Sequence, residues 1–423
     1  MGKHSKSKPD DNDGQNTKSN KDFERKPNSS VVWFICSIGI FVVLFSLISV
    51  VFPGLIISIV DTNLFGETFE IGAMGIPFLI VNVIIFSLIA LGIKHRLPNV
   101  FTNVIQKILS FDISKKNSFG ILIIILSIYV VVTVNELSIY ELNQYGDFLV
   151  LEKAVKIWPE QESENKYLAE QLDRHVRMAL LVTSEEVFDN IKIIPYLASI
   201  FLLITTYFLT VKLSEKNFTG LIAVILILQS STFYVYDTIA VYENFWVLFY
   251  VFSIYLIFKK PKFSSVFFIL SIFSKAIFVL WLPISILVTL LSDIPKDKKI
   301  FVIITHILVI IISVIIFQYS DAVYGNVVDI EVSEFWIGFT TLASNLRFDI
   351  VLLLLLLPVS VGLFIKARMG SKNSISLLVL ISGTILYGEL EKWWDINDGK
   401  ILVIVGIVFI IGVLITIKGL KMF

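Results

Sequence analysis

The sequence predicts an all-α integral membrane protein, a polytopic helical bundle of about 12 transmembrane helices with amphipathic helices at the external membrane surface. Hydrophobic residues make up 56% of the 423-residue chain, above the roughly 45–50% that is usual for soluble domains. They occur in long runs separated by short charged segments. A soluble globular enzyme of ordinary composition is therefore excluded.

The amino-terminal segment differs in composition from everything that follows. Residues 1–30 are rich in Lys, Asp, Asn and Ser and contain almost no apolar side chains. Such a segment cannot bury enough surface to offset the entropy of ordering, so we expect a disordered cytoplasmic tail. The apolar run at 31–60 exceeds the core of a cleavable signal peptide. It predicts a first transmembrane helix, interrupted at Pro53 and Gly54.

The later apolar runs are bounded by charged and turn-forming residues, which set the expected ends of each helix. The runs 263–274 and 276–291 together cover about 29 residues, too many for one untilted crossing, so we expect a helical hairpin there. The expected spans are residues 31–58, 72–93, 119–134, 191–211, 218–232, 244–258, 263–274, 276–291, 300–317, 350–365, 375–388 and 401–417.

Positive charge indicates the orientation of these spans. With the amino terminus inside, about 25 of the 35 Lys and Arg residues fall on the cytoplasmic side, as the positive-inside rule requires. We therefore expect a multi-pass protein of the cell membrane with a cytoplasmic amino terminus. Beyond the tail, the basic clusters on that side are Lys94/Arg96/Lys115/Lys116, Lys212/Lys216, Lys259/Lys260/Lys262, Lys296/Lys298/Lys299, Lys366/Arg368/Lys372 and Lys418/Lys421.

Three external loops are longer than a turn requires, at 135–190, 318–349 and 389–400. In the first loop, apolar residues recur every three or four positions over 148–158 and 167–181, which predicts two amphipathic helices at the membrane interface. A similar pattern over 97–111 predicts a surface helix on the cytoplasmic side. About fifty-five residues of external loop exceed what anchoring needs, and this surplus indicates a function.

The first external loop contains a candidate general base. Asp147 follows Tyr145 and Gly146 and opens the first predicted amphipathic helix. A carboxylate in this position can meet both lipid-embedded and water-soluble reactants. The alternative is a helix cap, since Asp is a common N-cap residue.

A second group of candidates lies in the short turn between the spans 218–232 and 244–258. Asp237 and Glu243 are its acids, and Tyr236 belongs to a set of tyrosines whose rings can stack on a sugar. Few other polar groups occur in this turn, which favours a binding role. The alternative interpretation is a pair of solvated charges at the ends of helices.

Cationic candidates occur at the same predicted surface. Lys275 lies between two apolar runs, and an ammonium at the membrane edge is costly unless it snorkels or binds an anion such as a lipid phosphate. Arg174 and Arg177 lie in the predicted amphipathic helix before the fourth span. Snorkelling and ordinary headgroup contact are the alternatives for these three residues.

No cofactor is required by the sequence. It contains no phosphate-binding loop, no dinucleotide fingerprint and no cluster of Cys and His with metal-ligand spacing. We expect no metal site built from protein ligands, although a divalent cation is compatible with the sequence. We also expect no nucleic-acid partner. The single Cys36 forms no disulfide within the chain.

Three stretches resemble the GT-C class of polytopic glycosyltransferases, in particular the branch of dolichyl-phosphate-mannose protein mannosyltransferases and lipid A aminoarabinose transferases. Tyr145-Gly146-Asp147 leading into 149–157 is similar to the first external loop of the family. Residues 195–212 and 220–258, with Asp237 in the turn, resemble its next helices. Residues 271–283, with Lys275, are similar to its lysine-bearing hairpin. The resemblance covers about residues 119–300 and rests on order and spacing.

The resemblance implies transfer of a sugar from a polyprenyl-phosphate donor to an external acceptor, which is a protein, lipid or glycan. Asp147 would be the catalytic base, and Lys275 with Arg174 or Arg177 would bind the donor phosphate. Asp237, Glu243 and Tyr236 would line the substrate site. The family often has two adjacent acids in this loop, whereas Phe148 follows Asp147.

Composition and the apolar runs divide the chain into a tail at 1–30, two additional spans and a cytoplasmic segment at 31–118, a module at 119–317, and further helices and loops at 318–423. The resemblance implies that the module at 119–317 is the catalytic part. Two other functions remain open. One is a transporter or flippase, which twelve spans also suit and which inverted repeats would favour. The other is a non-catalytic membrane partner.

Overall fold

The computed structural model describes residues 30–55, 69–94, 98–143, 145–158, 168, 171–172, 174–275, 281–319, 346 and 349–390. Across these residues the secondary structure is helical, with no strand, as predicted. The predicted tail, the predicted span 401–417 and most of the loops 318–349 and 389–400 lie outside the described residues.

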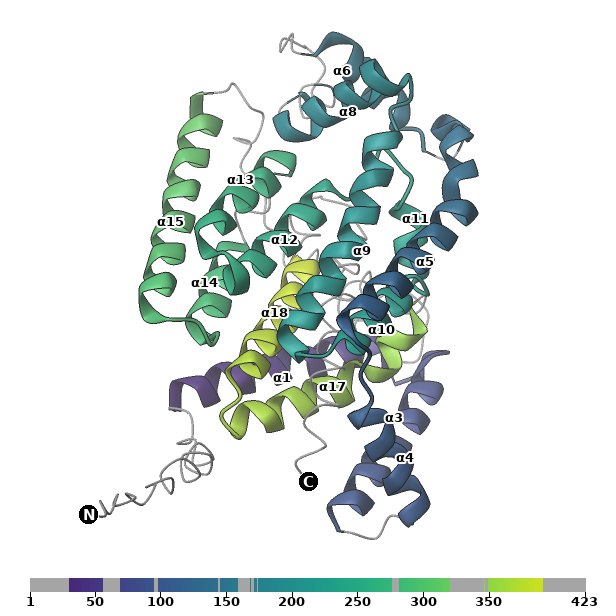
Figure 1. Cartoon of the computed structure of the whole chain (residues 1–423), viewed down its shortest axis with the longest axis vertical. Helices are drawn as coiled ribbons and strands as arrows, with labels where there is room; N and C mark the ends of the chain where they lie inside the picture. The colour runs from purple at the N-terminus through teal and green to yellow at the C-terminus, as the bar shows by residue number, and fades with distance from the viewer. Residues whose placement is uncertain are drawn as a thin grey trace, which may run out of the picture.

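Most helices lie where the apolar runs predict them (Figure 1). α1 ends at Val51, two residues before Pro53, so the predicted interruption is observed. The predicted surface segment 97–111 forms a helix, α4. The main helices are α1 (Ser30–Val51), α3 (Gly75–Ile93), α4 (Asn99–Ser110), α5 (Lys115–Thr133), α6 (Phe148–Ile157), α8 (His175–Phe188), α9 (Ile193–Ser214), α10 (Asn217–Ile227), α11 (Ser231–Tyr236), α12 (Phe245–Lys259), α13 (Ser264–Ser274), α14 (Leu282–Leu291), α15 (Lys296–Tyr319), α17 (Ile350–Arg368) and α18 (Lys372–Leu390).

Five segments in the described part of the chain are long and apolar enough to cross a membrane: Val32–Val51, Gly75–Gly92, Lys115–Ser138, Ile193–Ser214 and Ile350–Arg368. Four other predicted spans correspond to shorter helices, α10, α12, α13 and α14, of 11, 15, 11 and 10 residues. A helix of ten or eleven residues is about 16 Å long, roughly half the thickness of the hydrocarbon core. The structure thus supports a membrane protein without establishing twelve crossings.

The helices pack in two connected groups (Figure 1). In one group α9 packs against α10 and α12, and α12 packs against α13. In the other, α1, α17 and α18 pack together, and α14 joins this group through α18. A single large hydrophobic core runs through both groups and includes Leu202, Trp246, Leu353 and Leu378.

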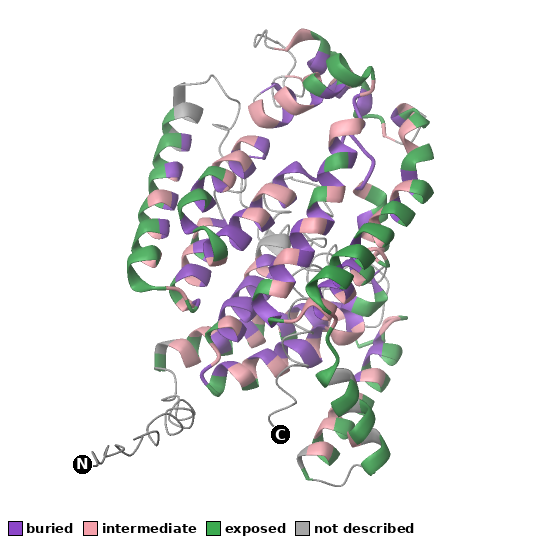
Figure 2. Cartoon of the chain, in the orientation of Figure 1, coloured by how far each residue is buried: buried purple, intermediate pink, exposed green. Residues whose placement is uncertain are grey.

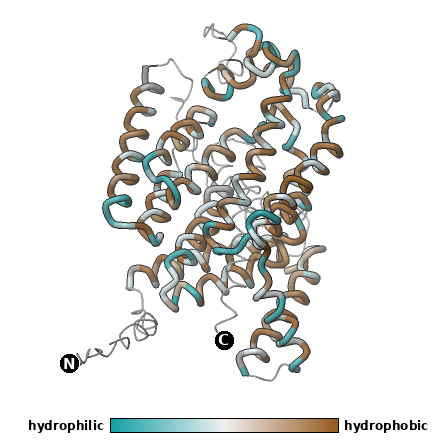
Figure 3. The backbone as a smooth tube through the Cα atoms, in the orientation of Figure 1, coloured by the Kyte–Doolittle hydropathy of each residue, from teal (hydrophilic) through white to brown (hydrophobic). Residues whose placement is uncertain are grey.

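The outer faces of several helices are apolar and uncovered. Only 17% of the span in α3 and 22% of the span that contains α5 are buried inside the protein. Figure 2 shows both helices largely exposed, and Figure 3 shows that their exposed turns are hydrophobic. In α3 the exposed side chains include Ile76, Ile80 and Val83. Apolar surface of this extent is unfavourable in water and suits contact with lipid chains.

One end of the molecule is covered by α6 and α8 (Figure 1). Beneath them lies a second, smaller hydrophobic cluster that includes Leu151, Met178, Leu181 and Phe245. The helix predicted over 148–158 is confirmed as α6. Of the helix predicted over 167–181, residues 175–181 belong to α8, which runs from His175 to Phe188 and ends where Asp189 adopts the left-handed conformation. We call this the α6–α8 end.

Candidate functional site

The centre of the α6–α8 end is the connection between α11 and α12, residues 237–244, which we call the 237–244 loop. A loop of this length normally runs over the surface. Here Asp237, Ala240 and Asn244 are completely inaccessible, and Ile239 and Val241 belong to the smaller hydrophobic cluster. The apolar residues in the middle of the loop fold inward under α6 and α8, which takes its polar groups away from water.

The partners of this loop come mainly from the end of α5 and the segment after it. Successive residues of this segment contact successive residues of the loop, so the two segments run side by side in the same direction. Tyr129 contacts Asp237, Glu136 contacts Thr238, Glu141 contacts Ala240 and Val241, and Asp147 contacts Tyr242.

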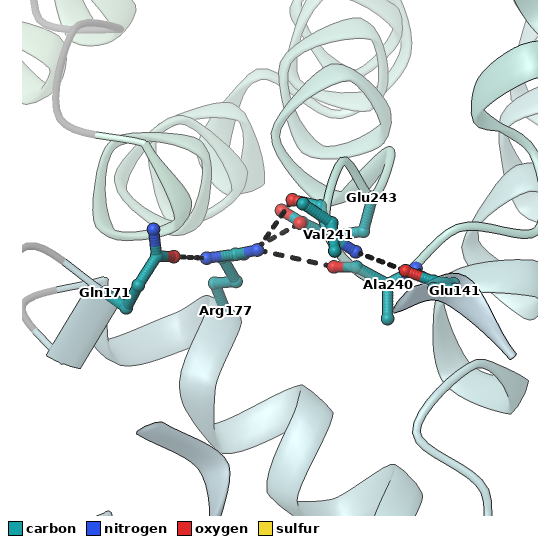
Figure 4. Close-up of polar contacts among 6 residues, drawn as sticks. All are labelled: Glu141, Gln171, Arg177, Ala240, Val241 and Glu243. Carbon is teal, nitrogen blue, oxygen red and sulfur yellow. Dashed lines mark hydrogen bonds and ion pairs between the residues drawn. The ribbon is translucent and has the colours of Figure 1, made fainter. Parts of the chain in front are cut away.

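Glu141 satisfies two backbone donors of the loop. Its carboxylate accepts the N–H of Ala240 at 2.6 Å and the N–H of Val241 at 3.1 Å (Figure 4). Burial raises the pKa of Glu141, and these two hydrogen bonds oppose the rise. Sequence analysis did not select Glu141 as a site residue, although it lies in the acid-rich segment that opens the first long loop.

Arg177 and Glu243 form a buried ion pair. Arg177 Nε lies 2.7 Å from Glu243 Oε2, and the side chains are 1% and 3% exposed. The guanidinium also donates to the carbonyl oxygens of Ala240 and Val241, at 3.3 and 2.8 Å, and to the side chain of Gln171 (Figure 4). Both residues were expected to bind substrate, and the structure places them in contact with each other.

Asp237 is completely buried and accepts a hydrogen bond from Tyr129 Oη at 2.7 Å. The pKa of Asp237 is raised to about 7: burial is the main cause, the Tyr129 hydrogen bond opposes the rise, and the nearby Glu136 adds to it. The alternative interpretation of Asp237 and Glu243 as solvated end charges is therefore wrong, because water does not reach either side chain.

Lys192 fastens the neighbouring segment to the start of α9. Its ammonium donates to the carbonyl oxygens of Glu136 at 2.6 Å and Ile139 at 3.2 Å. The side chain is only 6% exposed. Burial lowers the pKa of Lys192, while the carboxylates of Glu141 and Glu136 raise it. Sequence analysis missed Lys192 because a lysine before an apolar helix also reads as an ordinary flanking charge.

Asp147 is exposed and immediately precedes α6. It occupies the N-cap position of α6, as the helix-cap interpretation expects, but its side chain forms no capping hydrogen bond. Its Oδ2 accepts a hydrogen bond from Tyr242 Oη at 3.1 Å. The Tyr242 ring lies 5.4 Å from the ring of Tyr145 and 6.0 Å from that of Tyr236, centroid to centroid. An accessible carboxylate thus stands beside three partly buried aromatic rings.

The remaining cationic candidates occupy different settings. Lys275 follows α13 and is 6% exposed, with its ammonium 5.3 Å from the centre of the Trp246 ring. Trp246 is in the first turn of α12, directly after the 237–244 loop. Arg174 precedes α8 and is partly exposed. Lys275 is therefore close to the loop through Trp246.

The site brings together acids that can take or hold protons, buried cations and partly buried tyrosines. Within the described ranges, no three His, Cys, Asp or Glu side chains are grouped so that they could hold a metal ion. Proton transfer at the exposed Asp147 and charge stabilisation by a cation are the chemistry that these side chains offer.

Comparison with known proteins adds no assignment, because no protein family, curated protein or solved structure matches the chain.

Proposed function

We propose that this protein is a membrane glycosyltransferase that moves a sugar from a polyprenyl-phosphate donor to an acceptor at the external surface of the cell membrane, with its amino terminus in the cytoplasm. The observation that supports this function most directly is the position of Asp147. Its carboxylate is accessible, and it is held by Tyr242 on a loop whose other residues are buried.

Asp147 is the proposed general base. Tyr242 donates a hydrogen bond to Oδ2 of Asp147, and Oδ1 of Asp147 accepts no hydrogen bond within the described part of the chain. In the proposed step, the acceptor hydroxyl oxygen forms a bond to the anomeric carbon while the bond from that carbon to the phosphate oxygen breaks. The hydroxyl proton passes to Asp147, and polyprenyl phosphate leaves with the electron pair. General base catalysis of this kind contributes about 10²–10⁴-fold.

Lys275 and Arg174 are the proposed partners of the donor phosphate. A cation in a site from which water is largely excluded stabilises the charge that develops on a leaving phosphate. Arg177 is assigned a structural role, because its guanidinium is engaged with Glu243 and two loop carbonyls. Tyr242, Tyr236 and Tyr145 are the proposed platform for the sugar, and the exposed apolar faces of α3 and α5 suit contact with lipid.

The test is transfer by the full chain reconstituted in vesicles with polyprenyl-phosphate sugars. Asp147→Asn is expected to lower kcat by about 10²–10⁴-fold. Glu152→Gln is the matched control, because Glu152 is on the same helix and pairs with Lys156 at the surface; we expect it to retain full activity. Undiminished transfer by Asp147→Asn would remove Asp147 as the base.

A transporter or flippase is a second candidate, and Asp237 is the observation that favours it. A completely buried carboxyl with a pKa of about 7 can take up and release a proton near neutral pH, as proton-coupled transporters require. Counterflow in the same vesicles distinguishes the two functions. Movement of substrate that is abolished by Asp237→Asn and unaffected by Asp147→Asn would favour transport over transfer.

A further inference from the structure

A second functional surface lies at the opposite end of the molecule from the candidate site. α5 and α9 connect the two ends, with Tyr129 and Lys192 near the 237–244 loop and Ser118 and Tyr207 hydrogen-bonded at 2.8 Å further away. α5 has 19 residues and α9 has 22. Their lengths, roughly 29 and 33 Å, match a hydrocarbon core of about 30 Å. The α4 end (Figure 1) therefore faces the other membrane surface.

α4 is amphipathic, and two valines on its apolar side are exposed. Val100 and Val104 are 71% and 51% exposed. Asn103 and Gln106 lie on the opposite side of the helix by the 3.6-residue period, and Lys107 lies at the boundary between the two sides. Because the spans α3 and α5 flank α4 in the chain, the helix has to lie at the membrane surface. Uncovered valines beside a boundary lysine are typical of a helix that lies in the interface.

The end of α4 is fastened to the turn between α9 and α10. The Asp112 carboxylate accepts the backbone N–H groups of Ile113 and Phe218, at 2.9 and 3.0 Å. The rings of Phe111 and Phe218 lie 4.8 Å apart, and Asn217 donates to the carbonyl of Ile113 at 3.0 Å. These contacts hold the carboxyl end of α4 and the segment after it against the bundle.

Lysines gather around this turn. Lys107, Lys115, Lys116 and Lys212 are all exposed, and none forms an ion pair within the ranges that the structure describes. The acids nearest in sequence are Asp112, which binds two backbone N–H groups, and Glu215, which ends α9 in the left-handed conformation. The surface thus has an excess of positive charge next to the apolar side of α4.

We propose that α4 and these four lysines, together the α4 surface, bind anionic phospholipid headgroups. The apolar side of α4 inserts among the acyl chains, and the ammonium groups contact headgroup phosphates. The charge of this surface selects the partner, because each lysine is attracted to an anionic membrane. The valines beside the lysines need an apolar environment at the same depth, which acyl chains provide. The proposal is independent of the proposed transferase, since the two surfaces lie at opposite ends of α5.

The first experiment measures the depth of α4 in vesicles of phosphatidylglycerol and phosphatidylcholine. Spin labels are attached to Val104→Cys and Asn103→Cys in the full chain, with Cys36→Ser to remove the buried native thiol. We expect the label at 104 to be relaxed mainly by oxygen and the label at 103 mainly by a water-soluble nickel complex. Equal access of the nickel complex to both labels would overturn the proposal.

The second experiment measures binding of phosphatidylglycerol to the purified full chain by native mass spectrometry. The variant K107Q/K115Q/K116Q/K212Q is expected to bind about tenfold more weakly or worse. The matched control K260Q/K262Q/K296Q/K298Q removes four other exposed lysines and is expected to bind like the unmodified protein. An equal loss in both variants, or no preference for phosphatidylglycerol over phosphatidylcholine, would overturn the proposal. The latter result would leave a protein partner as the occupant of α4.

Discussion

Arg177 Nε lies 2.7 Å from Glu243 Oε2, and this buried pair joins α8 to the loop that precedes α12. The same guanidinium binds two carbonyl oxygens of that loop, while Glu141 binds the two corresponding N–H groups from the other side (Figure 4). Ala240 and Val241 are therefore held through both their donors and their acceptors. This double attachment explains how a polar connection stays ordered inside an apolar environment.

Removal of one partner of the buried pair is expected to be strongly destabilising. Arg177→Met leaves the Glu243 carboxylate buried without its counter-ion, which costs about 3–5 kcal/mol. The double variant R177M/E243L is expected to recover part of this loss, because no buried charge remains. Thermal unfolding of the full chain in detergent measures both effects. Lys156→Gln, which breaks only an exposed pair, is the control and is expected to unfold like the unmodified protein.

Glu141→Gln tests the attachment of the loop from the other side. An amide can accept one of the two N–H groups but turns its own NH₂ toward the other, so the variant is expected to lose about 1–3 kcal/mol. Faster hydrogen exchange is expected at the Ala240 and Val241 amides in particular. Glu185→Gln on the exposed side of α8 is the matched control. Unchanged protection of both amides in Glu141→Gln would contradict the assigned contact.

The stability of the protein is expected to depend on the titration of Asp237. The pKa of Asp237 is about 7 in the folded protein, against an ordinary value of 3.8 for an aspartate in water. The folded state therefore binds the proton more tightly than the unfolded state. The contribution of Asp237 to stability is therefore fully present below about pH 4 and is lost as pH rises to about 7, by on the order of 4 kcal/mol at most. The raised pKa of Glu141 also makes stability fall as pH rises, whereas the lowered pKa of Lys192 makes stability rise with pH.

The contribution of Asp237 is isolated by comparison with Asp237→Asn. The difference in unfolding free energy between the two proteins is measured from pH 4 to pH 8. It is expected to change between about pH 4 and pH 7 and to level off above about pH 7. Tyr129, Glu136 and Lys192 surround the carboxyl and are present in both proteins, so their titration largely cancels. A difference that does not vary with pH would exclude Asp237 as the titrating group.

Tyr242→Phe tests whether the hydroxyl positions Asp147. The ring and its contacts with Tyr145 and Tyr236 are kept, and only the 3.1 Å hydrogen bond is lost. If Asp147 is the base, a misplaced carboxylate is expected to lower kcat by about tenfold or more with little change in KM. Tyr140→Phe is the control, since Tyr140 contacts the Phe148 ring on the same surface. Equal activities of the two variants would show that the hydroxyl has no positioning role.

The apolar pattern of the sequence predicts the helices better than it predicts the crossings. The runs at 72–93, 191–211 and 350–365 correspond to α3, α9 and α17, because each is a continuous apolar helix. The run at 218–232 is not one helix, since α10 ends at Ile227 and Ser230 caps α11 through a hydrogen bond to the Phe233 N–H. Ser230 is a good N-cap in any chain, but an apolar window does not show whether the helix restarts.

The candidate site was predictable as a region and less so as a set of contacts. Asp147, Asp237, Glu243 and Lys275 stand out in the sequence because each is charged beside apolar runs, and the structure places all of them on or against the 237–244 loop and its first following turn. Glu141 and Lys192 were not found, because a flanking acid or lysine has the same appearance whether it is solvated or buried.

Composition and apolar periodicity alone identify a helical membrane protein, with an amphipathic helix at Phe148–Ile157 and an acid directly before it. Those features depend on composition and on periods of three to four residues, which are local. The pairing of Arg177 with Glu243, 66 positions later in the chain, and the burial of Asp237 become visible only in the packed helices. Pairings across such distances depend on how helices pack, and burial decides whether a charge is solvated, neutralised or shifted in pKa.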